Sequence, residues 1–383
     1  MTLLVIILVT ANLLVSARGV LLARRPFDVV TGRARSGPLP RLSIVVPARN
    51  EERQIENCVQ SLLTQRYPDF ELIVVDDCSE DQTLDILQRI ASANPRLRVV
   101  RGEPLPPAWV GKPWALAQGA RVAEGSWLLF TDADTVHHPD GAASAMAAAK
   151  ASNLDVLSLL TEQDLCTLPE RMLMPSLFLT ILDGTGPICD VGNPDKPGVA
   201  LFNGQYILIS RIAYDAIGGH ASVRTEIAED LELARRFKRD GRFRIALAAS
   251  RGIAHTRMYR SLREIWDGFT KNFALGIAGR PIWSALGIFV LACVSPLSPL
   301  VLLWLLASGQ WGAAAALALS LLPVLTVVGY RIRSAGLPPF SALWFPVGAA
   351  FVVAVSIASV LLFASGRGVR WRGRRYGGGF GRA

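Results

Sequence analysis

The chain has 383 residues, of which 51% are hydrophobic, and a formal net charge of +9, so it has room for one large domain or two small ones. The positive charge lies largely in the flanking segments and forms no basic stripe with interleaved aromatic residues, which argues against nucleic-acid binding and favours attraction to anionic lipid headgroups. The five cysteines form no CxxC pair, so a zinc or disulfide framework is excluded and reduced cytosolic thiols are expected.

Residues 1–23 form the first apolar segment, and no charge occurs before Arg18. About 20 apolar residues suffice to span a bilayer, so we expect an N-terminal transmembrane helix. A cleaved signal peptide is the alternative, but the basic residues follow the apolar segment instead of preceding it. By the positive-inside rule, these arginines place the central domain in the cytoplasm. They are Arg18, Arg24, Arg25, Arg33 and Arg35.

From about residue 40 to residue 260, predicted strands and helices alternate, which indicates an α/β domain with a mostly parallel sheet. We expect Ser79 to cap the second helix and Pro113 to occupy the first position of the third. The predicted strands cover 42–47, 70–75, 97–100, 127–130 and 154–160. The predicted helices cover 51–65, 81–92, a segment from 112, 139–150 and 231–239.

Three of these strands end in polar, mostly acidic residues. In a parallel sheet, ligands bind beyond the carboxyl ends of the strands, so these residues are expected to share one crevice. Asp132 and Asp134 alternate onto one side of the chain and can hold a hard cation, which would neutralise a diphosphate. Unrelated solvated turns are the alternative. The residues are Arg49 and Glu51 after 42–47, Asp76 and Asp77 after 70–75, and Asp132 and Asp134 after 127–130.

The second half of the chain is more apolar. Residues 169–182 predict a helix that is buried or lies on the membrane, and 184–198 predict a loop rich in Gly and Pro. Residues 261–280 predict an interfacial amphipathic helix, with an ordinary core-facing helix as the alternative.

The C-terminal region, residues 281–366, has about three predicted spans, near 284–306, 312–329 and 341–364. Three spans would place the basic tail, residues 367–383, outside the cell. Either one span is re-entrant or interfacial, or the tail breaks the positive-inside rule.

Five segments occur in a recognisable order: VVPARNEE, ELIVVDDCSEDQT, GKPWALAQGA, LLFTDADT and AEDLELARRFKRDG. Together they resemble the inverting family 2 glycosyltransferases of GT-A fold, over residues 42–273. The membrane helices and the segment HTRMYRSLREIWDGFTKN are similar to the subgroup that glycosylates isoprenoid lipids such as carotenoids and hopanoids. The resemblance implies transfer of a sugar from a UDP- or GDP-sugar to a lipid hydroxyl, with inversion and with Mg²⁺ or Mn²⁺ as cofactor.

The resemblance also implies a role for each matching residue. Asp230 would be the base that takes the proton of the acceptor hydroxyl, with Glu229 beside it. The alternative role of Glu229 and Asp230 is to stabilise the N-terminus of a helix through its dipole. Glu226 is a less favoured candidate for the base. Asp134, with Asp132, would hold the cation that stabilises the leaving diphosphate. The residues expected to bind the nucleotide sugar are Pro47, Arg49, Glu51, Asp76, Asp77, Lys112, Asp132 and Arg257. Of the pair Asp76 and Asp77, Asp77 is favoured as the residue that contacts the nucleobase. For Lys112, a solvated surface lysine is the alternative.

Other positions have two possible roles. Asn203 and Gly204 would form the floor of the acceptor site, because glycine permits close backbone approach, or they form a turn between strands. His255 is a further metal ligand or a structural residue. His137 and His138 are expected to be loop residues.

Two other functions stay open. A processive polysaccharide synthase is disfavoured because the Gln-x-x-Arg-Trp motif of such enzymes keeps only Arg257 here. A non-catalytic nucleotide-binding scaffold or transporter is disfavoured because the C-terminal spans lack intramembrane charges along a path. We therefore expect a multi-pass protein of the cytoplasmic membrane with its catalytic domain in the cytoplasm.

Overall fold

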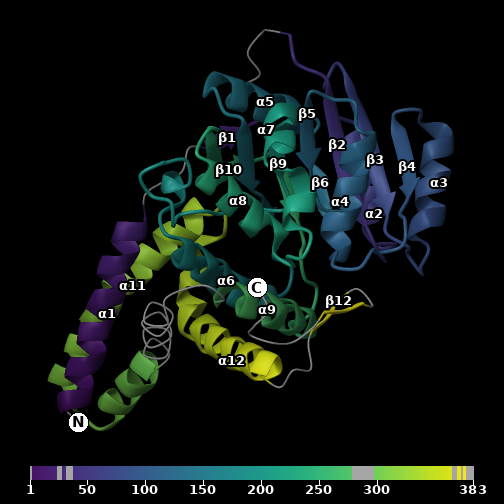
Figure 1. Ribbon diagram of the computed structural model, residues 1–383. Helices are drawn as coiled ribbons and strands as arrows, with labels where there is room; N and C mark the ends of the chain where they lie inside the picture. The colour runs from purple at the N-terminus through teal and green to yellow at the C-terminus, as the bar shows by residue number, and fades with distance from the viewer. Residues whose placement is uncertain are drawn as a thin grey trace. The chain divides into compact units, whose positions relative to one another are not determined.

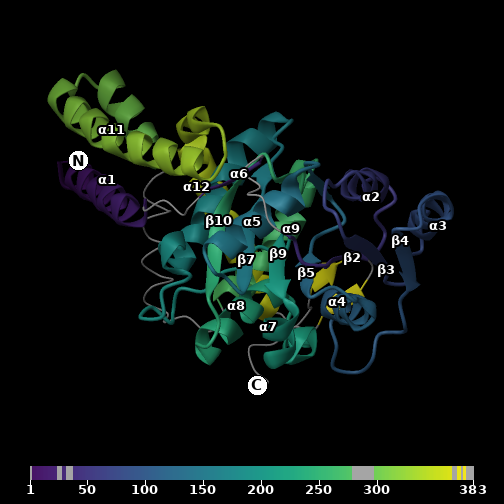
Figure 2. The same ribbon diagram turned by 90° about the horizontal axis from the view of Figure 1, so that it is seen from above.

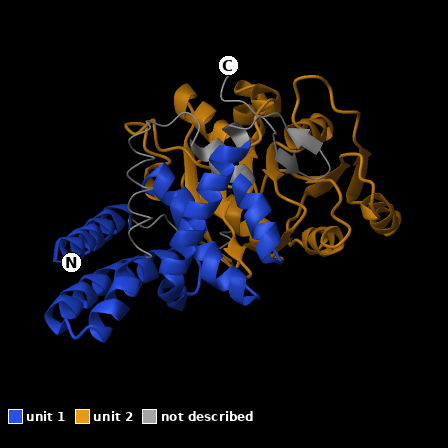
Figure 3. Ribbon diagram, turned by 90° about the horizontal axis from the view of Figure 1, so that it is seen from below, with its two compact units in different colours: residues 1–25, 165–187, 259–383 blue, residues 26–164, 188–258 orange. Residues whose placement is uncertain are grey.

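The computed structural model describes residues 2–23, 28–31, 38–277, 297–364, 369–371 and 374–376. The chain divides into two compact units, coloured separately in Figure 3. The sheet unit comprises residues 26–164 and 188–258, and the helical unit comprises residues 1–25, 165–187 and 259–383.

An eight-stranded sheet forms the centre of the sheet unit, with strand order β1-β10-β7-β9-β5-β2-β3-β4 (Figure 1). Every neighbouring pair is parallel except those of β9, which runs antiparallel to β5 and β7. The predicted α/β fold with a mostly parallel sheet is confirmed. The strands are β1 (Asp28–Val30), β2 (Leu42–Ala48), β3 (Phe70–Asp76), β4 (Leu97–Arg101), β5 (Trp127–Phe130), β7 (Val156–Leu160), β9 (Ile207–Ser210) and β10 (Ile245–Arg251).

Helices cover both faces of this sheet because side chains alternate along each strand. In β2, Ile44 and Val46 pack with α2 (Ile55–Leu63), α3 (Thr83–Ala93) and α5 (Gly141–Ala151). Val45 faces the other way, into a cluster with α4 (Gly111–Val122), α7 (Arg211–Ala216) and α8 (Glu229–Asp240). Figure 2 shows α2 and α4 on opposite sides of β2 and β3.

A second, three-stranded sheet lies beside the acidic end of β5. It consists of β6 (Thr135–His137), β11 (Ala254–Thr256) and β8 (Glu162–Gln163), with β11 antiparallel to β6 and parallel to β8. These strands have two or three residues, too few to show an alternating pattern in the sequence. The expectation that His137 is a loop residue is therefore wrong.

Two predicted helix starts also differ from the structure. The N-cap of α3 is Gln82, and its side chain makes no capping bond. Ser79 instead accepts a hydrogen bond from the backbone N–H of Asn50, in the turn after β2. Pro113 is the third residue of α4, still within the first turn, where its missing N–H costs no helical hydrogen bond.

The helical unit contains α1 (Thr2–Leu22), α6 (Leu168–Thr185), α9 (Leu262–Ile277), α11 (Trp311–Ser334), η3 (Pro339–Trp344) and α12 (Phe345–Ala364). Three segments are long and apolar enough to cross a membrane, namely Thr2–Leu22, Trp311–Ser334 and Pro339–Leu362. The predicted span 284–306 falls largely outside the described residues; its described end belongs to a shorter apolar helix, Leu297–Ala307. A short hairpin, β12 (Val369–Trp371) and β13 (Arg374–Tyr376), lies in the basic tail.

Part of the apolar face predicted near residues 261–273 is packed inside the helical unit, whereas Leu262 at its start is exposed. Ile265 and Phe269 of α9 are buried. The ring of Phe269 contacts Phe178 of α6, and Trp266 contacts Phe351 of α12. This packing is what the core-facing alternative predicts for the helix.

Candidate active site

The carboxyl end of β2 carries Pro47, a residue that is unusual in a central strand because it has no N–H. The carbonyl of Val45 accepts a hydrogen bond from the backbone N–H of Thr131, which follows β5. Backbone groups two residues apart in a strand point to the same neighbour, so the backbone nitrogen of Pro47 also points toward β5. The pairing of β2 with β5 ends at Val45 and Phe130. The missing N–H of Pro47 therefore breaks no bond of the ladder, and the strand end stays open beside β5.

The turns after β2 and β3 hold each other in place. Asn50 and Cys78 both have φ of 55°, which is costly for residues other than glycine. The Asn50 side chain accepts a hydrogen bond from the N–H of Glu80. The Arg49 guanidinium donates to the carbonyls of Asp77 and Cys78, at 2.6 and 2.8 Å. Arg49 thus braces the turn that carries the two predicted nucleotide-binding aspartates.

Asp76 and Asp77 are both buried at the end of β3. One carboxylate oxygen of Asp76, Oδ2, accepts a hydrogen bond from the N–H of Ser79. Its other oxygen, Oδ1, is buried and has no hydrogen-bond partner among the residues that the structure describes. Such an oxygen is costly to leave unsatisfied, so it is a ready acceptor for a ligand N–H or a water. The preference for Asp77 over Asp76 as the residue that binds the nucleobase stays a prediction.

Three carboxylates gather above Cys58 of α2. The thiol is fully buried, and its Sγ lies 3.6 Å from the carbonyl oxygen of Asp132. Burial raises the pKa of Cys58, and the negative charges of Asp134, Asp132 and Glu51 raise it further. Glu51 of the β2 turn therefore lies near enough to Cys58 to act on its thiol, as do the two aspartates after β5.

Lys112, in the first turn of α4, lies between two of the predicted acidic residues. Its Nζ is 2.7 Å from Oδ1 of Asp132 and 2.8 Å from Oε1 of Glu229. Burial opposes its charge, but Asp132, Glu229 and Asp230 outweigh that effect and hold the pKa of Lys112 well above its usual value. Lys112 is therefore a paired cation within the acidic cluster, and the alternative of a solvated surface lysine is wrong.

Gly204 and Asp230 meet at the same cluster. The N–H of Gly204 donates to Oδ2 of Asp230 at 2.9 Å, and the N–H of Leu231 donates to Oδ1 at 2.8 Å. A Cβ atom at Gly204 would lie 2.9 Å from the Nζ of Lys112 and 3.2 Å from Oδ2 of Asp230. The close approach expected from glycine thus occurs, and it fixes a half-buried carboxylate beside Lys112.

This close approach gives a direct test of the cluster. In Gly204→Ala, the added methyl group must displace the Lys112 ammonium or the Asp230 carboxylate, so we expect catalytic turnover to fall about tenfold or more. Gly198→Ala is the matched control, because a Cβ there meets no atom within 4 Å. Steady-state turnover of the two variants checks the prediction, and equal turnover in both would contradict it.

Glu229 differs from its neighbour Asp230 in being buried, with a side chain 5% exposed. Burial raises the pKa of Glu229 from 4.5 to about 7, although Lys112 lowers it and Asp230 raises it again. A group whose pKa is higher in the folded than in the unfolded chain stabilises the folded state at pH values below its pKa in the unfolded chain. This contribution is lost as the pH rises through its pKa in the folded chain.

We therefore expect the unfolding temperature of the native protein, relative to Glu229→Gln, to fall as the pH rises from about 4.5 to about 7. The glutamine variant removes this titration and keeps an acceptor for Lys112. Tryptophan fluorescence melting curves of both purified proteins over this range measure the difference. A difference that stays constant with pH would contradict the assignment.

A buried pair beside Lys112 gives no sequence signal. The hydroxyl of Tyr214 lies 2.9 Å from Nδ1 of His220, and the ring of His220 contacts Phe130 at the end of β5. Burial lowers the pKa of His220 to about 3, and the nearby charge of Lys112 lowers it further, so this histidine is neutral. Tyr214 and His220 belong to none of the acidic motifs, so they could not have been identified from spacing.

Arg257 immediately follows β11, beside the two aspartates. In the register of β11 with β6, Thr256 lies opposite Thr135, and its hydroxyl donates to the carbonyl oxygen of Asp134 at 3.0 Å. This pairing places the backbone of Arg257 next to the Asp134 position. The short second sheet is therefore what joins the last predicted motif to the acidic end of β5.

The remaining predicted residues have structural partners. The amide of Asn203 donates to the carbonyl of Leu159 at 2.8 Å, which fixes the turn before β9. His255 contacts Asp164 through Nδ1, at 2.6 Å, and so has a partner other than the two aspartates predicted to bind a metal. Burial lowers the pKa of His137 to about 3, and its Nε2 lies 3.0 Å from the hydroxyl of Thr131. The exposed His138 lies in the turn before α5.

The two aspartates after β5 suit a hard divalent cation. Both are half-buried and supply carboxylate oxygens. Mg²⁺ is commonly bound by one or two carboxylates together with substrate phosphates and water. Among the described residues, no group of three or more His, Cys, Asp or Glu side chains is arranged to hold a metal ion. Lys112 already places one positive charge against Asp132. The donor set therefore fits a cation that is completed by a diphosphate and water.

Comparisons with known proteins relate part of the chain to glycosyltransferases. Residues 43–171 match the family model described as Glycosyl transferase family 2. The 4,4'-diaponeurosporenoate glycosyltransferase of Staphylococcus haemolyticus (strain JCSC1435) is 24% identical over 289 residues, which cover 74% of this chain and 75% of that protein. The poly(ribitol-phosphate) beta-N-acetylglucosaminyltransferase TarS of Staphylococcus aureus (strain Mu50 / ATCC 700699) is 34% identical over 123 residues, 30% of this chain and 20% of that protein.

One solved structure resembles most of the chain. It is a mannosyltransferase from Pyrobaculum calidifontis, in complex with GDP-Man and Mn²⁺. The TM-score is 0.56 with 20% sequence identity, and the match covers 93% of this chain and 98% of that one. This likeness is one of fold.

Proposed function

We propose that this chain, whose residues 43–171 match the model of glycosyl transferase family 2, transfers one sugar from a nucleoside-diphosphate sugar to a hydroxyl of a membrane lipid, with inversion. The observation that carries the proposal is one cluster built from four separate segments. Lys112 forms ion pairs with Asp132 and Glu229, and the N–H of Gly204 donates to Asp230, the neighbour of Glu229. These are the residue types that a reaction with an anionic leaving group and a hydroxyl nucleophile requires.

The donor side of the reaction uses the positive charge of the cluster. A nucleoside diphosphate gains negative charge as its bond to the anomeric carbon breaks, and a fixed ammonium at Lys112 stabilises that charge. Asp132 and Asp134 would hold a divalent cation, which supplies Lewis-acid stabilisation of the same group. The mannosyltransferase of similar fold was solved with GDP-Man and Mn²⁺, which supports this assignment. The buried Asp76 and Asp77 would bind the nucleotide base.

The acceptor side uses Asp230. Two backbone N–H groups hold its carboxylate, and the side chain stays half-buried at the cluster. In the proposed single displacement, the acceptor oxygen forms a bond to the anomeric carbon while the bond to the diphosphate breaks. The hydroxyl proton passes to the carboxylate of Asp230. Glu229 is buried against Lys112, so its role is to orient the lysine.

A lipid acceptor is favoured by two features outside the cluster. Three helical segments are long and apolar enough to cross a membrane. The relative from Staphylococcus haemolyticus, similar over 74% of this chain, is named as a 4,4'-diaponeurosporenoate glycosyltransferase. With the basic residues that follow α1, the positive-inside rule supports a cytoplasmic position for the sheet unit.

The experiment that tests this function uses the purified full-length protein in lipid nanodiscs. Radiolabelled UDP- and GDP-sugars are supplied with Mn²⁺ or Mg²⁺ and an isoprenoid lipid extract, and the organic phase is analysed for label. We expect one labelled glycolipid that disappears with EDTA and in Asp134→Asn. The anomeric configuration of the product, determined by NMR, tests inversion. Failure of every donor to label lipid or to be hydrolysed would support a non-catalytic scaffold, and long polymer would support a processive synthase.

A further inference from the structure

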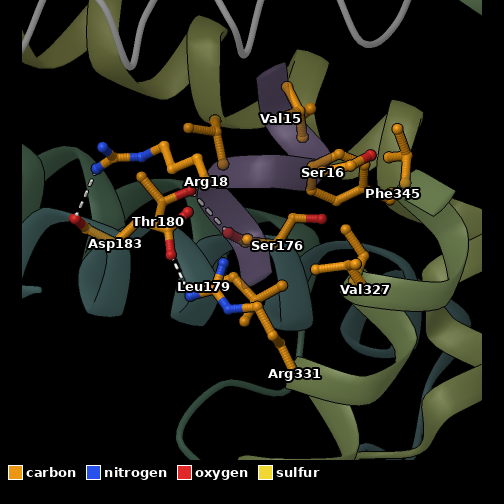
Figure 4. A pocket seen from close by; sticks show the side chains of 15 residues that line it. Val15, Ser16, Arg18, Ser176, Leu179, Thr180, Asp183, Val327, Arg331 and Phe345 are labelled. Atoms are coloured by element: carbon orange, nitrogen blue, oxygen red, sulfur yellow. Dashed lines mark hydrogen bonds and ion pairs between the residues drawn. The ribbon is translucent and has the colours of Figure 1, made fainter. Parts of the chain in front are cut away.

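The helical unit contains a partly open cavity of about 80 Å³ among four of its helices, α1, α6, α11 and α12. Figure 4 shows the side chains around it. Its wall is mostly apolar and is formed by valine, leucine, alanine and phenylalanine side chains, among them Val15, Leu179, Val327 and Phe345. An engineered apolar cavity of about 150 Å³ binds benzene, so a space of about half that size admits a short stretch of one hydrocarbon chain and excludes a bulky ring.

Charged groups lie along one side of this cavity. Arg331 of α11 forms an ion pair with Asp183 of α6, and the Arg331 side chain is only 10% exposed. Arg18 of α1 donates to the backbone carbonyl of Asp183 at 3.1 Å (Figure 4). Among the described residues, Arg18 pairs with no carboxylate. Two guanidinium groups therefore lie beside one acidic residue, whose carboxylate pairs only with Arg331, and the positive charge of Arg18 is left over for a ligand.

The two arginines lie at the same end of two parallel helices. Val5 and Leu8 in the first half of α1 pack with Ala314 and Leu317 of α11. Gly19, near the end of α1, lies beside Val327 and Arg331. In a chain that spans a bilayer, such arginines lie at the level of the lipid headgroups, while the apolar residues before them lie among the acyl chains.

We propose that this cavity binds an anionic phospholipid, with part of one acyl chain among the four helices and the phosphate at Arg18 and Arg331. Guanidinium groups bind phosphate through charge-assisted hydrogen bonds, and the apolar wall accepts the chain next to them. The proposal does not depend on sugar transfer, because the lipid is bound without a donor and no residue that lines the cavity is assigned to the reaction.

Native mass spectrometry of the full-length protein in a neutral detergent tests this site, with phosphatidylglycerol and phosphatidylcholine of identical acyl chains. We expect phosphatidylglycerol to bind roughly tenfold more tightly, and Arg18→Gln to remove that preference. Arg333→Gln is the matched control, because Arg333 is an exposed arginine of the same helix as Arg331 and does not line the cavity. Ala349→Leu, which fills the cavity and keeps both arginines, is expected to weaken binding by a similar factor.

Inorganic phosphate distinguishes a lipid site from a simple anion site. At the same concentration it should neither stabilise the protein against heat nor compete with phosphatidylglycerol. Equal affinity for the two lipids, an equal loss in Arg333→Gln, or competition by phosphate alone would each overturn the proposal. Because Arg18→Gln alters only a bond to a backbone carbonyl, its folding is not at risk, and the test does not depend on Ala349→Leu.

Discussion

Asp230→Asn is expected to lower the turnover number by about 10²- to 10⁴-fold, the usual contribution of a positioned general base. Asparagine keeps the shape of the side chain and can still accept one of the two backbone hydrogen bonds from Gly204 and Leu231. It cannot take a proton from the acceptor hydroxyl. Affinity for the nucleoside diphosphate should change little, because Lys112 and its contacts with Asp132 and Glu229 stay in place.

Glu226→Gln serves as the control for this variant. Glu226 precedes Asp230 by four residues, is exposed, and contacts the hydroxyl of Thr225 instead of the cluster. Turnover is measured by transfer of labelled sugar, and donor binding is measured by calorimetry with the nucleoside diphosphate and Mn²⁺. If Asp230→Asn retained near-normal turnover while Glu226→Gln lost it, the assignment of the base would be wrong.

Long apolar runs made the centre of the fold predictable from the sequence. The strands predicted at 42–47, 70–75 and 127–130 correspond to β2, β3 and β5. A strand that is covered on both faces is apolar at nearly every position, and such a run is visible in the sequence. The antiparallel strand β9 was not predicted. It has four residues and lies between β5 and β7, which are separated from it by helices and loops in the sequence. Such a pairing is long-range and has no local signature.

The acidic residues of the site were predictable because each follows a strand, and strand ends in a parallel sheet share one edge. The pairing of Lys112 was not predictable. The sequence could not show that its ammonium lies between Asp132 and Glu229, residues 20 and 117 positions away in the chain. Nor could it show that Glu229, and not Asp230, is the buried member of its pair. These facts depend on how α4 and α8 pack on the same face of the sheet.

The pairing of Lys112 leads to the second large effect. Lys112→Met removes the charge and keeps the length of the side chain. Glu229 is 5% exposed and loses its cationic partner, while Lys112 itself is 34% exposed. Removing one partner of a buried ion pair costs about 3–5 kcal/mol. The partial exposure of Lys112 and the protonation of Glu229 both reduce this cost. We therefore expect the unfolding free energy to fall by about 1–3 kcal/mol. Affinity for the nucleoside diphosphate should fall by roughly tenfold or more, because the cation proposed to bind the phosphates is gone.

The double variant Lys112→Met/Glu229→Gln separates these two effects. Replacing Glu229 removes the buried acid that lacked a partner, so much of the lost stability should return. The lost affinity for the diphosphate should not return, because neither substitution restores a cation near Asp132. Lys150→Met, at an exposed lysine in the last turn of α5, controls for loss of a positive charge elsewhere. Thermal unfolding and diphosphate titration of the four proteins give both quantities. Recovery of diphosphate affinity in the double variant would show that Lys112 serves only to neutralise Glu229 and does not bind the donor.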